Sequence, residues 1–113
     1  MAEPPPTPSV QEAQQGLDQY LDVGEVVTAV VVGGVERGGV HVAVSNRGIW
    51  LAGPTWRPIH RVPNHELTGI ERVEGGLVVE AGADRLPVRV WDEAAADRFV
   101  SSAHQWLEAW EDS

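Results

Sequence analysis

Hydrophobic residues recur along this chain with two different periods, and each period predicts a different kind of element. Near the N-terminus, apolar residues recur every three or four positions from Val10 to Leu21, which predicts a short helix lying on a surface. Ser9 and Glu12 have the spacing of a capping box at its start. The proline-rich residues 1–9 predict an extended or disordered tail, whose proline spacing also fits a polyproline-II ligand.

From residue 25 onward the hydrophobic period changes to two, which is typical of strands. The first of these runs is apolar at nearly every position, which predicts a strand covered on both faces. The glycine-rich residues 33–39 are predicted to be a flexible hairpin loop, and later glycines and prolines separate further runs. The predicted strands are 25–32, 40–44, 49–52, 59–62, 67–73, 77–81 and 86–91.

The clearest helical pattern covers residues 92–111. Asp92 is a suitable N-cap, and the apolar residues that follow at steps of three and four are Ala96, Phe99, Val100, Ala103, Trp106, Leu107 and Trp110. Such a stripe predicts a helix that packs across a hydrophobic surface. Residues 10–111 are therefore expected to form one mainly β domain. Its seven-stranded, strongly bent antiparallel sheet, or partly open barrel, is closed by a C-terminal amphipathic helix.

The charge of the chain limits its partners. The 113 residues carry a net charge of −9, and the stretch from Met1 to Glu25 holds five acids and no base. A field this negative repels phosphate backbones and anionic headgroups, so we expect neither nucleic-acid binding nor stable membrane association. We also expect a cytoplasmic location, because the first residues lack the pattern of a secretory signal and no apolar stretch approaches the ~18 residues of a membrane span.

Composition also restricts the chemistry. With no cysteine, the chain has no disulfides, thiolate nucleophiles or cysteine-ligated zinc. The histidines show no metal-ligand spacing, and no nucleophile motif or phosphate-binding loop is present, so we expect no metal, no cofactor and no enzymatic activity. An enzyme would instead require His60, His65 and a carboxylate such as Glu66 to converge in a pocket.

Three segments carry a resemblance to a known family. Leu21–Val26 contains a leucine and a Gly-Glu pair before a strand, Val40–Leu51 is an apolar hairpin with Asn-Arg at its turn, and Ile59–Val73 is a spaced isoleucine and valine segment. Over about Leu21 to Trp110 the chain resembles the bacterial pleckstrin-homology-like (PH-like) domain family. The absence of lysine, with abundant alanine, glycine and valine, also suggests a bacterial origin.

The resemblance implies a module that docks or assembles proteins. Phospholipid-binding members of the family place several basic residues around the first hairpin. Here that hairpin offers only Arg37, next to Glu36, so the resemblance does not imply binding of lipid headgroups.

The tryptophans are the main candidates for a binding surface. Trp50 and Trp91 are out of phase with neighbours that point inward, so strand alternation places both indoles on the opposite sheet face. That face is covered by the N-terminal helix, bound by a partner, or buried in a homodimer. Trp56 lies beside Arg57 on a proline-bounded loop, which either forms a binding hot spot or folds back onto the barrel.

We therefore interpret the chain as a non-catalytic interaction or scaffold module that docks another protein. Its candidate binding residues are Trp50, Trp91, Trp56, Arg57 and Arg37. The alternative is a small-molecule or lipid-binding module that uses the open end of the barrel near Arg37, Trp56 and Arg57.

Overall fold

The computed structural model describes residues 8–35, 38–90 and 92–111. Within these ranges the chain forms one helix, seven strands and a second helix, in that order. The helices are α1 (Val10–Leu17) and α2 (Glu93–Glu111). The strands are β1 (Val27–Val35), β2 (Gly38–Ser45), β3 (Gly48–Ala52), β4 (Pro58–Pro63), β5 (Gly69–Val73), β6 (Gly76–Ala81) and β7 (Asp84–Val90). The proline-rich tail predicted for residues 1–9 lies almost entirely outside the described residues.

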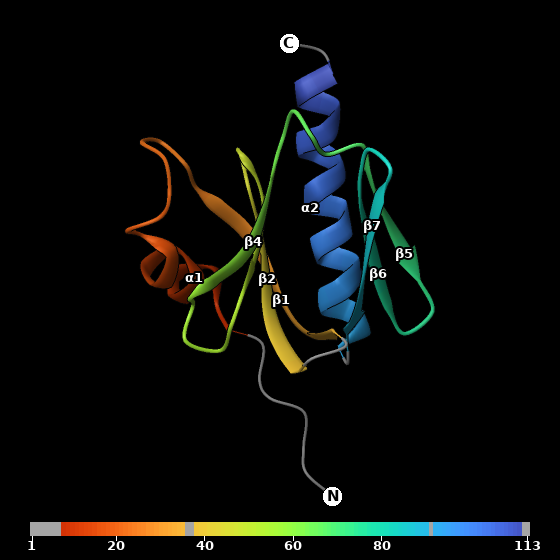
Figure 1. The fold of residues 1–113 in the computed structure, drawn as a ribbon, viewed down its shortest axis with the longest axis horizontal. Coiled ribbons are helices and arrows are strands. Elements are labelled where there is room, and N and C mark those ends of the chain that lie inside the picture. The colour runs from red at the N-terminus through yellow and green to blue at the C-terminus, as the bar shows by residue number, and fades with distance from the viewer. Residues whose placement is uncertain (1–7, 36–37, 91, 112–113) are drawn as a thin grey trace, which may run out of the picture.

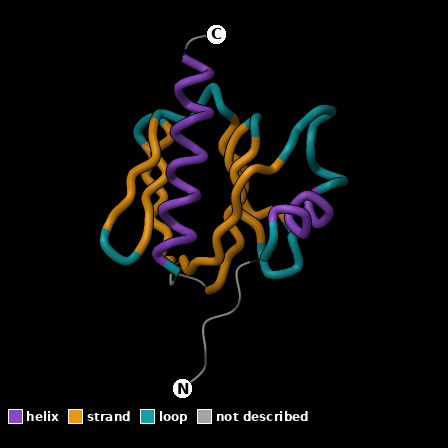
Figure 2. Tube along the Cα trace, turned by 180° about the vertical axis from the view of Figure 1, so that it is seen from behind, coloured by secondary structure: helices purple, strands orange, loops and turns teal. Residues whose placement is uncertain are grey.

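The strands form one antiparallel sheet in the order β4-β3-β2-β1-β7-β6-β5. Because β4 and β5 do not pair with each other, the sheet is bent but not closed. Figure 1 shows α2 running between the two halves of the bent sheet, and Figure 2 shows the same arrangement from behind. This confirms the predicted class: a mainly β, seven-stranded antiparallel sheet with a C-terminal helix and a short N-terminal helix.

The larger core lies between the inner face of the sheet and α2. Phe99 is fully buried at its centre, and the predicted helix stripe supplies Ala96, Val100 and Ala103 to the same cluster. Trp106 packs at its margin and donates a hydrogen bond from Nε1 to the Thr28 hydroxyl at 3.0 Å.

The smaller core lies on the opposite, outer face of the sheet, beneath α1. Ala13 and Leu17 of α1 are fully buried against Val27 and Val30 of β1. A bulge between Val27 and Ala29 shifts the alternation of β1, so Val27 and Val30 both face outward. Val31 consequently faces the inner core beneath α2.

The first hairpin also differs from the sequence expectation. The predicted loop over residues 33–39 is largely strand, because β1 continues to Val35 and β2 begins at Gly38. Gly33 pairs with Val90 where β1 meets β7, and a Cβ at this glycine would overlap the carbonyl oxygen of Arg89. Gly33 therefore permits two strands to approach closely, which the sequence pattern alone did not indicate.

Candidate functional site

Trp50 lies on the outer face of β3, as strand alternation predicted, and it is covered there. Its neighbours Ile49 and Leu51 belong to the inner core, whereas Trp50 packs in the outer core with Ala13 and Leu17 of α1. Only 5% of Trp50 is exposed. Of the alternatives that the sequence left open for this face, coverage by the N-terminal helix is the one observed.

A buried carboxylate holds the Trp50 indole in place. Glu25 lies just before β1, and its side chain is completely inaccessible to solvent. Oε2 accepts hydrogen bonds from Trp50 Nε1 at 2.9 Å and from the Ser45 hydroxyl. Oε1 accepts one from the backbone N–H of Asp22 at 3.0 Å. The carboxylate is therefore well supplied with donors, as a buried charge requires.

Arg61 of β4 supplies the balancing charge at the edge of this network. Its Nη2 lies 3.4 Å from Glu25 Oε1 and 3.0 Å from Asp22 Oδ2. The guanidinium carbon also lies 4.8 Å from the centre of the Trp50 ring, within the range of a cation–π contact. Arg61 thus pairs with acids from the N-terminal end of the chain, whereas Arg72 pairs with Glu93 and Asp97 of α2.

The segment from α1 to β1 is fixed to the sheet by a side-chain amide as well. Gln14 Nε2 donates to the carbonyl of Glu25 at 3.2 Å, and Gln14 Oε1 accepts from the N–H of Val27 at 2.8 Å. The amide thereby satisfies two backbone groups at the start of β1. Sequence reasoning missed both Gln14 and Glu25, although a carboxylate at the start of an otherwise apolar strand was a signal for the second.

Trp56 lies on the loop between β3 and β4 and folds back toward α1. Its backbone is in the left-handed region with φ of 65°, and its N–H donates to the carbonyl of Gly53 at 2.9 Å. Gly16 of α1 lies directly against the indole, because a Cβ there would overlap the Trp56 side chain. The ring also contacts His41, with centroids 4.4 Å apart. Trp56 is consequently half-buried at the rim of the outer core.

The remaining predicted binding residues are distributed differently. Arg57 follows Trp56 and is exposed, and its carbonyl accepts from the N–H of Gly53 at 2.9 Å. Arg37 and Trp91 lie outside the described residues. The structure therefore brings Trp50 and Trp56 into one cluster beneath α1, with Arg57 as the neighbouring solvent-facing group.

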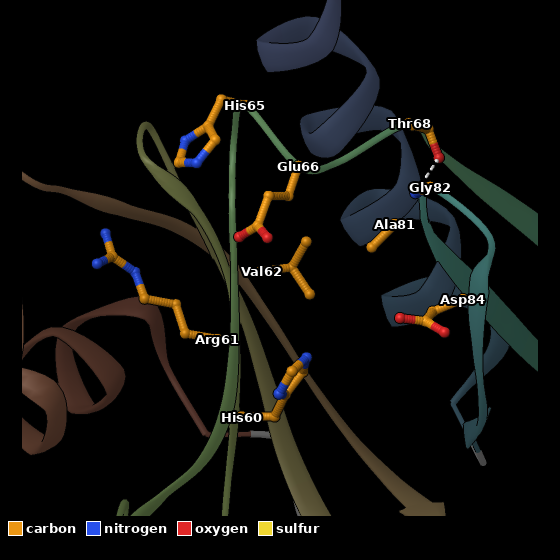
Figure 3. Close-up of a pocket in the computed structure, with 9 residues that line it drawn as sticks. All are labelled: His60, Arg61, Val62, His65, Glu66, Thr68, Ala81, Gly82 and Asp84. Carbon is orange, nitrogen blue, oxygen red and sulfur yellow. Dashed lines mark hydrogen bonds between the residues drawn. The ribbon is translucent and has the colours of Figure 1, made fainter.

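A separate pocket lies at the open side of the sheet. It has a volume of about 360 Å³ and is formed by three segments: β4, the loop from β4 to β5, and the turn from β6 to β7. In Figure 3, Val62 and Ala81 point toward each other across the gap, whereas Arg61 extends to the other side of β4. Thr68 accepts a hydrogen bond from the N–H of Gly82 at 3.1 Å and so ties two of these segments together.

The pocket contains the residues that an enzyme would have required. His60, His65 and Glu66 all line it, but in Figure 3 the His65 ring extends away from Glu66 on the far side of β4. Within residues 8–35, 38–90 and 92–111, no three histidine or carboxylate side chains are arranged to hold a metal ion. The gathered side chains form a mixed polar and apolar hollow in which His65 and Glu66 are directed to opposite sides of β4.

Comparisons with known proteins define the class of fold. No family model and no curated protein matches the chain. Among solved structures, the fold is similar to that of the human myosin 7b C-terminal MyTH4-FERM domain in complex with the harmonin-a PDZ3 domain, with a TM-score of 0.52 and 14% sequence identity. The similarity covers 83% of this chain but only 20% of that one, so this chain spans about a fifth of the solved chain's length. This structural similarity shows that this chain has a PH-like fold.

In the part of the chain that the structure describes, neither helix is both long enough and apolar enough to cross a membrane.

Proposed function

We propose that this chain is a non-catalytic docking module that binds another protein. The observation that carries the proposal is the fixed loop at Trp56 and Arg57. Hydrogen bonds to Gly53 and the packing of the indole beneath α1 hold this loop, and Arg57 is exposed beside it. Because these contacts hold the loop backbone, binding costs little backbone freedom, and an exposed arginine beside a half-buried tryptophan combines two residue types that are enriched in binding hot spots.

The comparison with solved structures supports a protein partner only in general terms. The solved MyTH4-FERM domain of similar fold is bound to a PDZ domain, and at 14% identity this likeness extends to the fold alone. The placement among bacterial PH-like domains is likewise our proposal, and it rests on the lysine-free composition and on the segment Leu21–Val26.

The test is a pull-down from the source cells with tagged protein, compared with an Arg57→Glu variant. We expect one recovered protein that binds the purified wild-type chain directly and binds the variant at least tenfold more weakly, because a hot-spot contact is worth about 1–2 kcal/mol or more. Arg47→Glu is the matched control, because Arg47 is also exposed on a turn between strands and the charge change is identical. Equal recovery with Arg57→Glu and Arg47→Glu would remove this loop as the docking site.

A small-molecule ligand is the second candidate function, and the pocket of about 360 Å³ favours it. The lining of this pocket includes neither Trp56 nor Arg57, so such a ligand would occupy a different surface from the one that the sequence suggested. Native mass spectrometry of freshly purified protein distinguishes the two candidates: a mass increment that disappears on denaturation supports a small ligand, and the bare chain mass counts against it.

A further inference from the structure

The open side of the bent sheet is a second surface with a defined chemistry. β4 and β5 are its edge strands, and the pocket of about 360 Å³ lies between β4 and the turn from β6 to β7. Figure 3 shows this gap with side chains from both borders directed into it. A hollow beside an edge strand is a place where side chains of another chain segment can be bound.

The charges available at this pocket are negative. Glu66 and Asp84 are both exposed at its rim, and neither has an ion-pair partner among the residues that the structure describes. The one arginine of the lining, Arg61, is engaged by Asp22 and Glu25 on the other side of β4. A cation entering the hollow therefore meets two carboxylates without displacing an existing ion pair.

The wall between these carboxylates is partly apolar. Val62 is 2% exposed and belongs to the inner core, and Ala81 is partly buried against the same core. A long basic side chain suits such a hollow, because its methylene stem can pack on apolar surface while its charged end reaches the rim. Ile59 lies on the same strand just outside the lining of the hollow, and 63% of its surface is accessible.

Two features, the shortness of the regular edge of β4 and the net charge of the chain, disfavour a second copy of this chain as the occupant. β4 begins at Pro58 and ends at Pro63, and its register with β3 is irregular near Ile59, so only a short stretch of edge can pair with another strand. Edge-to-edge pairing of two copies would also bring together two chains that each carry a net charge of −9. Side-chain recognition of a basic segment avoids both difficulties.

We propose that this open side binds a basic, extended segment of a partner protein. One arginine or lysine of that segment enters the hollow, where its charged end lies between Glu66 and Asp84, and an apolar neighbour of it contacts Ile59. This proposal rests on the docking function proposed above, and it assigns that function a second contact surface and a partner chemistry.

The probe is a capped pentapeptide of alternating threonine and valine with a central arginine, titrated into isotopically labelled protein and followed by NMR. We expect amide shifts confined to residues 59–62, 65–68 and 81–84. A peptide with glutamine in place of arginine should bind at least fivefold more weakly, since it lacks the charge that the two carboxylates attract. Shifts elsewhere, no shifts at all, or equal affinity for both peptides would overturn the proposal.

A double variant tests the carboxylates themselves. Glu66→Gln with Asp84→Asn should weaken binding of the arginine peptide about fivefold, while the control pair Asp18→Asn with Glu74→Gln, exposed acids with the same charge change, should not. Equal effects of the two pairs would show a non-specific attraction and reject the site. A stable dimer in native mass spectrometry that Ile59→Lys abolishes would reject it in favour of a second copy.

The experiments distinguish failure of the basic-segment site from failure of the docking function proposed for the Arg57 loop. If the partner recovered in the pull-down depends on Arg57 but tolerates the Glu66 and Asp84 changes, docking stands and the basic-segment site fails. If the peptide binds as described but the pull-down yields no protein at the Arg57 loop, the loop assignment fails while the pocket assignment stands.

Discussion

Glu25 is a single residue that connects the N-terminal segment, β2, β3 and β4. A buried carboxylate is costly to desolvate, and here the indole of Trp50, the hydroxyl of Ser45 and the backbone N–H of Asp22 offset that cost. Removing the carboxylate would leave buried donors without acceptors and the Arg61 guanidinium without one of its partners.

Glu25→Ala is therefore expected to lower the free energy of unfolding by about 3 kcal/mol. Urea denaturation followed by tryptophan fluorescence measures this loss. Glu74→Ala, at an exposed turn position, is the control and should change stability by less than about 0.5 kcal/mol. A loss at Glu25 as small as that of the control would mean that the network does not stabilise the fold.

His41 is the second residue whose environment has a measurable consequence. It contacts Trp56 beneath α1, and its Nδ1 is buried with no hydrogen-bond partner among the described residues. Burial lowers the pKa of His41 below its usual 6.5, and the nearby Glu12 carboxylate partly opposes this shift.

The sign of the pH dependence follows from that shift. The unfolded chain binds the proton at 6.5 and the folded chain only at lower pH, so stability decreases as pH falls through 6.5 and levels off below the folded pKa. The difference in unfolding free energy between wild type and His41→Gln, measured between about pH 7.5 and 5, should show this decrease. A difference that is independent of pH would contradict the burial of a neutral imidazole.

At the scale of elements, α1 is a short helix whose stability comes from the surface it covers. An isolated helix of eight residues is unstable in water, and α1 is held by Ala13 and Leu17 in the outer core and by the amide of Gln14. Gly16 lowers the intrinsic helix propensity, but it makes room for the Trp56 indole.

Gly16→Ala should therefore have the opposite sign to its effect in an ordinary helix. Alanine in place of glycine normally stabilises a helix interior by about 1 kcal/mol, whereas the overlap with Trp56 should here cost about 1–3 kcal/mol. Thermal unfolding compared with Gln15→Ala, an exposed position of the same helix, measures the effect. A Gly16→Ala variant that is more stable than wild type would show that α1 does not pack against Trp56 in this way.

At the scale of the whole molecule, one sheet carries two cores on its opposite faces. The inner core beneath α2 contains most of the buried apolar residues, and the outer core beneath α1 is smaller. Phe99 is the largest fully buried side chain of the inner core, so its truncation should affect the entire fold.

Phe99→Ala is expected to cost about 3–5 kcal/mol and to shift the denaturation curves of all probes together. Val10→Ala, at a position on α1 that is 40% exposed, should leave the midpoint nearly unchanged. Calorimetry and near-ultraviolet circular dichroism provide the comparison. A small loss of unfolding free energy in Phe99→Ala, or separate transitions by calorimetry and circular dichroism, would show that the domain does not unfold cooperatively around the inner core.

The sequence by itself determined the class of fold, because that class depends on local periodicity. The two-residue period predicted all seven strands, and the stripe from Ala96 to Trp106 predicted the helix that covers the inner face. Alternation around Trp50 also predicted which sheet face its indole occupies.

The tertiary structure alone decided which surfaces are covered and which remain open. The β1 bulge, the burial of Glu25 and the role of Gly33 depend on contacts between residues that are far apart in sequence, and periodicity does not encode such contacts. The pocket is a further case, because its borders are separated by β5 and β6 in the chain and meet only where the sheet bends without closing. Local pattern thus specified the elements, and the packing of non-local segments specified the candidate sites.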